Sequence, residues 1–182
     1  MDKKQIRKHL IEIRKKIPKE KKVIYDKIIS QQIIESDYFK KAGQVLVFAS
    51  NEDEFDTRFI IEQCRLKYKR VFYPVCLDNC GNMAFRKVDS VGDLKIGMYN
   101  LLEPKDSCKQ YIPQESDIII VPALSVDKNG YRIGYGKGYY DRFLKDFNGV
   151  SICPCYEELL TDTLPHEETD IKINVLVTQQ RR

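Results

Sequence analysis

Apolar residues recur at helical spacing along the first seventeen positions. They are Ile6, Leu10, Ile13 and Ile17, and Pro18 follows them directly. Steps of four, three and four residues place these side chains on one face, so the pattern predicts an amphipathic helix over residues 2–17.

Three cations lie at the border of that apolar face. At about 100° per residue, Lys3, Arg7 and Arg14 fall within about 40° of one another, next to the buried stripe rather than opposite it. Lys4, Lys8 and Lys15 fall on a different side, where solvation explains them. We therefore expect Lys3, Arg7 and Arg14 to lean over whatever the helix packs against.

The rest of the chain alternates between helical and extended patterns. Helices are expected over residues 19–35, 56–68 and 138–147, with Asp56 or Thr57 as the N-cap of the second of these. Strands are expected over residues 45–49, 70–76, 83–88, 117–124, 149–155 and 173–178, with 83–88 at an edge. Strand and helix at these intervals predict a parallel sheet with helices on its faces. We find no internal repeat or linker, and we expect one domain over residues 1–182.

Composition is that of a charge-rich globule, with 42% hydrophobic and 32% charged residues among 182. The apolar runs span only four or five residues, whereas a bilayer-spanning helix needs about 20. We expect no membrane span, no secretory signal and a cytoplasmic location. The six cysteines are then expected to be reduced, and their spacing lacks the paired hooks of a structural zinc site.

Positive charge is concentrated near the N-terminus. Residues 1–41 contain 13 Lys and Arg against 6 Asp and Glu, so the remainder of a chain with net charge +4 is slightly acidic. Two readings remain open at this point, namely solvated basic helices and an anion site served by the first helix.

The segment RIGYGKGYYDRF, residues 132–143, contains glycine at three alternate positions directly before a predicted helix. Such backbone approaches a ligand closely, and the free N–H groups of a helix start favour anions. The segment is not a Walker A loop, because Gly138 stands where Ser or Thr is required. It is not a dinucleotide fingerprint either, because Tyr139 replaces the third glycine. A plain glycine turn remains the alternative.

The neighbouring side chains favour a phosphate site beside a flat ring. Arg132 and Lys137 supply cations, and Asp141 supplies a carboxylate suited to Mg²⁺. The tyrosines at 135, 139 and 140 supply flat faces and hydroxyls.

RIGYGKGYYDRFL resembles the glycine-rich segment of the 5-formyltetrahydrofolate cyclo-ligases. The resemblance continues in order along nearly the whole chain. It includes KKQIR near the start, FASNEDEFDT, the YP at 73–74, LLEP, DIIIVPAL with VDKNG, LPHEETD and VLVT.

This resemblance implies a single-domain, three-layer α/β/α fold with a mostly parallel, Rossmann-like central sheet. It implies ATP- and Mg²⁺-dependent conversion of 5-formyltetrahydrofolate to 5,10-methenyltetrahydrofolate, with release of ADP and phosphate. In such enzymes the formyl oxygen attacks the γ-phosphate, and N10 then closes the ring on the N5-iminium phosphate. The implied partner is a reduced folate, with or without a polyglutamate tail, and the implied state is a monomer without nucleic-acid or membrane partners.

The resemblance also implies roles for individual residues. The implied ATP-binding residues are Lys3, Lys4, Gln5, Ile6, Arg7, Arg132, Ile133, Gly134, Tyr135, Gly136, Lys137, Gly138, Tyr139 and Tyr140. The implied folate-binding residues are Ala49, Glu54, Tyr135, Gly136, Lys137, Gly138 and Tyr139. Arg132, Lys137 and Tyr139 are the implied catalytic residues, and Asp141 and Asp170 are the implied magnesium ligands.

Other interpretations of these residues stay open. Glu54 also fits an ordinary loop carboxylate, and Asp170 lies in an acidic run typical of solvated surface. At the level of function, the alternatives are a basic nucleic-acid-binding module and an ATP-independent enzyme resembling sugar-phosphate isomerases.

Overall fold

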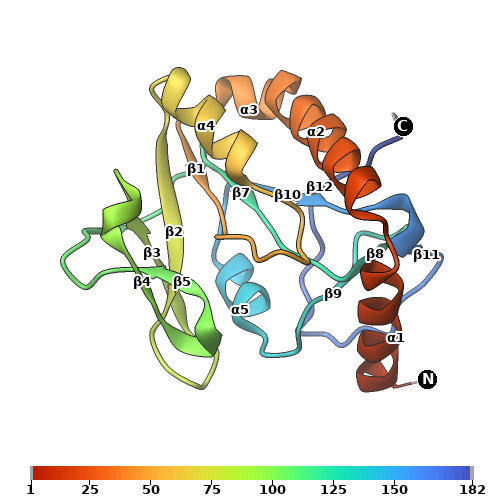
Figure 1. Cartoon of the computed structure of the whole chain (residues 1–182). Helices are drawn as coiled ribbons and strands as arrows, with labels where there is room; N and C mark the ends of the chain where they lie inside the picture. The colour runs from red at the N-terminus through yellow and green to blue at the C-terminus, as the bar shows by residue number, and fades with distance from the viewer. Residues whose placement is uncertain (1, 181–182) are drawn as a thin grey trace.

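A computed structural model describes residues 2–180, and its centre is a seven-stranded sheet (Figure 1). The strand order is β12-β10-β7-β1-β2-β3-β6. The strands are β1 (Gln44–Leu46), β2 (Arg70–Cys76), β3 (Met83–Lys87), β6 (Gln110–Tyr111), β7 (Ile118–Ile120), β10 (Val150–Pro154) and β12 (Val175–Val177). The five strands from β12 to β2 pair in parallel, whereas β3 is antiparallel to both β2 and β6.

Helices cover both faces of this sheet (Figure 1). On one face lie α2 (Lys19–Glu35), α3 (Asp37–Lys41) and α4 (Arg58–Leu66), and on the other lies α5 (Tyr139–Lys145). The first helix, α1 (Lys3–Lys15), packs near the carboxyl ends of the strands, where its Leu10 is buried. The predicted α/β fold with a mostly parallel sheet is confirmed.

Two smaller sheets complete the structure. One joins β11 (Leu160–Thr161), β8 (Ser125–Asp127) and β9 (Arg132–Ile133), and the other joins β4 (Leu94–Ile96) and β5 (Leu102–Pro104). Short 3-10 turns lie at Val91–Asp93, Met98–Asn100 and Glu157–Leu159. Within residues 2–180, no helix is long and apolar enough to cross a bilayer.

The sequence predicted each main element but misjudged some details. The segment 83–88 is not an edge strand, because β6 pairs with its outer side. The small strands β4, β5, β6, β8, β9 and β11 and the helix α3 were not predicted, since two to five residues carry little periodicity. At the start of α4, the Asp56 carboxylate accepts from the Arg58 N–H at 2.9 Å, whereas the Thr57 hydroxyl donates to Phe48 O instead of capping the helix.

The apolar interior explains why the central strands read as unbroken hydrophobic runs. Ile118, Ile119 and Ile120 of β7 are all buried, since β7 has a strand on each side and side chains packed on both faces. Such strands show no alternation of apolar and polar residues. The chain leaves β1 toward β2 on one side and places β7 on the other, so the sheet order reverses next to β1. Crevices outside the carboxyl ends of strands at such a point are the usual ligand sites of open α/β sheets.

A buried polar contact joins α2 to the end of β10. The Tyr156 hydroxyl donates to Asp26 Oδ1 at 2.6 Å, and Lys22 holds the other carboxylate oxygen at 2.8 Å. The rings of Tyr156 and Tyr25 lie 6.0 Å apart, but the Tyr25 hydroxyl donates to Glu158 in an exposed contact at 2.9 Å.

This difference predicts unequal effects of two matched substitutions. Tyr156→Phe removes a buried donor to a carboxylate, which costs on the order of 1–3 kcal/mol of unfolding free energy. Tyr25→Phe removes an exposed contact and is expected to change stability by less than about 0.5 kcal/mol. Urea denaturation of both variants at pH 7 measures the difference, and equal midpoints would contradict the assignment.

Candidate active site

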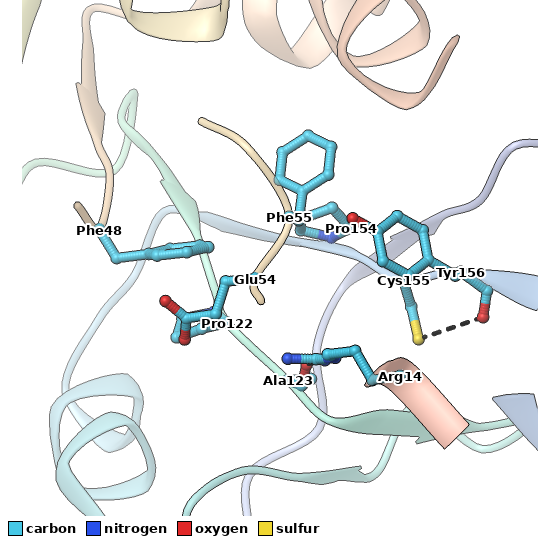
Figure 2. Close-up of a pocket in the computed structure, with 9 residues that line it drawn as sticks. All are labelled: Arg14, Phe48, Glu54, Phe55, Pro122, Ala123, Pro154, Cys155 and Tyr156. Carbon is cyan, nitrogen blue, oxygen red and sulfur yellow. Dashed lines mark hydrogen bonds between the residues drawn. The ribbon is translucent and has the colours of Figure 1, made fainter. Parts of the chain in front are cut away.

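The carboxyl ends of β1, β7 and β10 meet at a small cavity of about 10 Å³ (Figure 2). Its lining comes from α1, from the segments after these strands and from the loop before α4, and consists of Arg14, Phe48, Glu54, Phe55, Pro122, Ala123, Pro154, Cys155 and Tyr156. An open cleft of about 410 Å³ shares Arg14 with this cavity and reaches Asn51, Leu124 and Tyr135. A volume of this size suits a small organic ligand.

The glycine-rich segment runs from β9 into α5, and Arg7 of α1 packs on it. Gly136 has φ +90°, a left-handed conformation that favours glycine. A Cβ atom there would lie 2.8 Å from Arg7 Cζ, so the missing side chain is what lets the guanidinium pack on the loop. Arg7 Nε donates to Gly134 O at 2.9 Å. A cation of α1 and the backbone of the glycine-rich segment are thereby held together.

All three cations of the predicted stripe contact the protein body. Besides Arg7, the Arg14 guanidinium donates to Ala123 O, and Lys3 Nζ binds Asp170 Oδ2 at 2.6 Å and Glu167 Oε1 at 2.9 Å. The prediction that these side chains lean over the surface beneath α1 is confirmed. By contrast, Lys4 and Gln5 are exposed, and the Gln5 side chain accepts from the Asp2 N–H in the capping box that starts α1.

The predicted magnesium ligands lie in neighbouring segments, each held through one oxygen. Asp141 Oδ1 accepts from Arg132 at 3.0 Å and from the Ile171 N–H at 3.1 Å. Asp170 Oδ2 accepts from Lys3 and from the Glu167 N–H. The second oxygen of each carboxylate, Asp141 Oδ2 or Asp170 Oδ1, has no hydrogen-bond partner within residues 2–180. Each carboxylate is thus oriented and keeps one oxygen for a further ligand.

Charge favours ionised Asp170 in this setting. Burial acts to raise the pKa of its carboxyl, but hydrogen bonds from Lys3 and the Glu167 N–H, with the positive charges of Lys3 and Arg132, lower the pKa overall. Arg132 itself is almost fully buried, and its other contact is to Ile171 O at 2.6 Å. The acidic run around Asp170 is therefore more than solvated surface.

The turn between β2 and β3 also supports the glycine-rich segment, which the sequence did not predict. The Tyr139 hydroxyl donates to Asp78 O at 2.5 Å, and Arg142 donates to Lys137 O at 3.1 Å. Gly81 has φ +98°, and a Cβ there would lie 2.0 Å from an Arg142 nitrogen. Asp78 and Gly81 lie about 60 residues before Tyr139 and Arg142, a separation that local patterns do not bridge.

A second unpredicted contact comes from the turn between β4 and β5. The Tyr99 ring lies 5.2 Å from Lys137 Nζ, and its hydroxyl is 3.4 Å from that of Tyr139. Tyr99 has φ +57°, which is rare for a residue with a large side chain. The predicted catalytic residues Lys137 and Tyr139 thus share a neighbour.

Tyr140 points inward from α5. Its hydroxyl is buried and has no hydrogen-bond partner within residues 2–180, and burial raises its pKa well above the ordinary value. A buried donor without a partner is uncommon and marks a position where a ligand or water completes the bonding.

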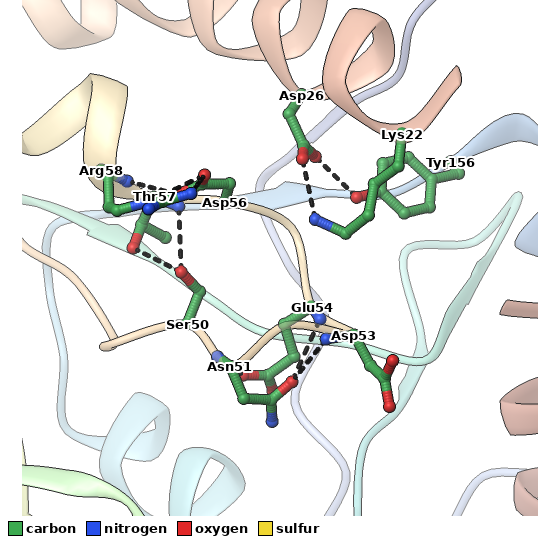
Figure 3. Close-up of polar contacts among 10 residues, drawn as sticks. All are labelled: Lys22, Asp26, Ser50, Asn51, Asp53, Glu54, Asp56, Thr57, Arg58 and Tyr156. Atoms are coloured by element: carbon green, nitrogen blue, oxygen red, sulfur yellow. Dashed lines mark hydrogen bonds and ion pairs between the residues drawn. The ribbon is translucent and has the colours of Figure 1, made fainter. Parts of the chain in front are cut away.

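The loop after β1 brings Glu54 to the small cavity (Figure 3). Asn51 Oδ1 accepts from the N–H groups of Asp53 and Glu54, while the Asn51 N–H donates to Glu54 Oε2 at 3.1 Å. Burial raises the pKa of the Glu54 carboxyl, although the Asn51 N–H, the Arg14 charge and the Tyr135 hydroxyl each favour the ionised form. Ala49 is half-buried at the start of the same loop.

A comparison with known families agrees with this geometry. The model of the 5-formyltetrahydrofolate cyclo-ligase family matches residues 1–179. The chain belongs to this family. Its members are ligases of folate and one-carbon metabolism that use ATP.

Relatives resemble most of the chain, and solved structures resemble nearly all of it. The 5-formyltetrahydrofolate cyclo-ligase of Escherichia coli K12 is 32% identical over 145 residues, which cover 77% of this chain and 80% of the relative. The Aquifex aeolicus 5,10-methenyltetrahydrofolate synthetase structure has a TM-score of 0.87 at 29% identity and covers 100% of this chain and 91% of its own. A Mycoplasma pneumoniae synthetase, at 21% identity and TM-score 0.79, covers 99% of this chain and 100% of its own and shares the fold.

Because the pKa of Glu54 is raised, removing its charge is expected to increase folding stability by an amount that depends on pH. A carboxyl whose pKa is higher in the folded state contributes stability below its ordinary pKa, and this contribution is lost as the pH rises through the folded-state pKa. Glu54→Gln is therefore expected to be more stable than the unmodified cyclo-ligase at pH 7.5, with a difference that narrows toward pH 4.5.

The exposed Glu52 in the same loop provides the matched control. Glu52→Gln is expected to follow the unmodified protein at every pH in thermal unfolding. If Glu54→Gln also does so, the burial of a costly charge at this position is disproved.

Proposed function

We propose that this chain binds MgATP on the glycine-rich segment and closes the ring of 5-formyltetrahydrofolate in the adjoining cleft. The observation that carries the proposal is the packing of Arg7 on Gly136 and Gly134, beside a cleft of about 410 Å³. This packing joins a cation near the N-terminus to the backbone of residues 134–136, which lie more than 120 residues later in the chain.

The nucleotide phosphates are assigned to the segment from Arg132 to Tyr140, with Lys3 and Arg7 as the cations contributed by α1. Phosphate oxygens accept hydrogen bonds from guanidinium, ammonium and backbone N–H groups, and all three kinds lie together here. The buried Arg132 serves as a fixed positive charge, whereas the exposed Lys137 follows the phosphoryl group as it moves.

Magnesium is assigned to the oxygens of Asp141 and Asp170 that have no other partner. Within residues 2–180, no group of three or more His, Cys, Asp or Glu side chains is arranged to hold a metal ion. Two carboxylates are nevertheless typical of Mg²⁺ sites, in which phosphate oxygens and water complete the coordination. The ion would supply charge neutralisation at the transferred phosphoryl group.

The reduced folate is assigned to the cleft, with its pterin ring toward Glu54 and Ala49. An ionised carboxylate accepts hydrogen bonds from the amino and ring N–H groups of a pterin. Tyr135 belongs to the glycine-rich segment and also lines the cleft, so it contacts both substrates in this arrangement. The formyl oxygen then faces the γ-phosphate.

In this reaction the protein mainly positions charge. Phosphorylation of the formyl oxygen converts a poor leaving group into a good one, and N10 adds to the activated carbon as phosphate departs. Arg132 and Lys137 stabilise the negative charge on the transferred group, and the buried Tyr139 fixes the loop through Asp78 O. A monomeric state and acceptance of polyglutamylated folate stay predictions.

The decisive experiment is an absorbance assay with purified protein, 5-formyltetrahydrofolate and MgATP. The proposal expects appearance of the methenyl chromophore, with one ADP released per product and no product without ATP. An active ATP-independent reaction would favour the isomerase-like alternative, and inactivity with salt-sensitive RNA or DNA binding would favour the nucleic-acid module.

Asp141→Asn tests the assigned metal site. The amide keeps an oxygen for Arg132 and the Ile171 N–H, so the fold is expected to persist, while kcat/KM falls by about 100-fold and the Mg²⁺ requirement rises. Asp146→Asn, at the exposed end of α5, is the matched control and is expected to leave both unchanged. Equal Mg²⁺ titration curves for Asp141→Asn and the unmodified enzyme would remove Asp141 from the site.

A further inference from the structure

Arg14 is a buried cation that the assigned substrate contacts do not use. It lies one helical turn beyond Leu10 on α1, and only 9% of its surface is exposed. Its guanidinium donates to Ala123 O just beyond β7, yet its Nε is buried without a hydrogen-bond partner within residues 2–180. One contact to a carbonyl leaves the positive charge of this side chain uncompensated.

Glu54 is the carboxylate that faces the same cavity. Only 7% of its surface is exposed, and Figure 2 shows the Arg14 side chain extending from α1 toward the side of the pocket where Glu54 lies. The shared cavity of about 10 Å³ is space for roughly one water molecule, which is far too small for a bicyclic ring. Arg14 lines both this cavity and the larger cleft, whereas Glu54 lines only the cavity. No ligand ring fits between Arg14 and Glu54 in the cavity, so the charge of Arg14 acts on Glu54 across a space of about one water molecule.

The other groups around Glu54 do not supply this charge. Asp53, from the same loop, adds a negative charge, and Tyr135 and Tyr140 from the glycine-rich segment and α5 are neutral hydroxyls. Arg14 is the cation that acts on Glu54. Both side chains are buried and line one cavity, so loss of the Arg14 charge would leave the Glu54 charge without compensation.

We propose that Arg14, anchored on Ala123 O after β7, is a positioning residue that acts as the internal counter-charge of Glu54 across the cavity that both side chains line. This inference rests on the proposed function only in assigning the pterin ring to Glu54. Through Arg14, the helix assigned to contribute Lys3 and Arg7 to the nucleotide also lines the folate cleft and the cavity of Glu54. One rigid helix thereby aligns both substrates.

The first test is the pH dependence of KM for 5-formyltetrahydrofolate. In Arg14→Met, Glu54 loses its counter-charge and becomes protonated at higher pH, so the acidic limb of the profile moves upward. A shift of one pH unit corresponds to a roughly tenfold higher KM at a fixed pH on the limb. Arg14→Lys retains the charge and is expected to restore most of the original profile.

Lys16→Met is the matched control, since it removes a positive charge from the exposed end of the same helix. It is expected to leave the profile in place. If Arg14 only supported the fold, Arg14→Met would lower thermal stability while its pH profile stayed parallel to that of the unmodified protein. That outcome overturns the proposal.

The second test needs no activity. In a urea-denaturation cycle with Arg14→Met, Glu54→Gln and the double variant, Glu54→Gln is expected to stabilise Arg14→Met by more than it stabilises the unmodified protein, because Glu54 lacks its counter-charge in Arg14→Met. Additive effects overturn the proposal. If Arg14→Met does not fold, the same cycle is measured with Arg14→Gln in its place, and additivity there overturns the proposal.

The two tests separate the inference from the function on which it rests. Absence of the methenyl chromophore in the unmodified protein would defeat the proposed function, while the denaturation cycle would still decide whether Arg14 and Glu54 are coupled.

Discussion

The docking of α1 onto the carboxyl ends of the sheet is the constraint on which the candidate site depends. Three cations one or two turns apart reach three separate segments: Asp170 near the C-terminus, the glycine-rich segment, and Ala123 beyond β7. Burial of the apolar face holds the helix on the protein, and the contacts of the cations at its border fix its position along its axis. Displacing the helix by one turn would break all of these contacts together.

The same contacts help to offset the energetic cost of burying charged side chains in the site. Glu54 and Arg14 are both removed from water, and neither would be favoured there in isolation. Arg132 is similarly enclosed but is matched to Asp141 and a carbonyl oxygen. Oriented charges in a region that excludes water act more strongly on a reacting phosphoryl group than mobile surface charges do. The buried charges thus lower the folding stability relative to an apolar pocket, but they hold the charged groups of the site in fixed positions.

Much of this arrangement could be predicted because it follows from the local spacing of apolar residues. The helical spacing of Ile6 to Ile17 fixed the position of Lys3, Arg7 and Arg14, and the unbroken run at Ile118–Ile120 identified a central strand. The support of Tyr139 by Asp78 could not be predicted, since it joins distant segments through a backbone oxygen. The placement of Arg14 and Glu54 on one cavity could not be predicted for the same reason, and two-residue strands such as β9 carry no pattern of their own.

The turn at Gly81 has a consequence for how this enzyme tolerates sequence change. Hairpin tips are ordinarily places where families accept insertions and varied side chains. Here the tip is pressed against Arg142 and the carbonyl of Lys137, with no room for even a methyl group. Variation in this hairpin is therefore restricted by its packing on the glycine-rich segment, and a loop graft at this turn would displace the backbone to which the phosphates are assigned.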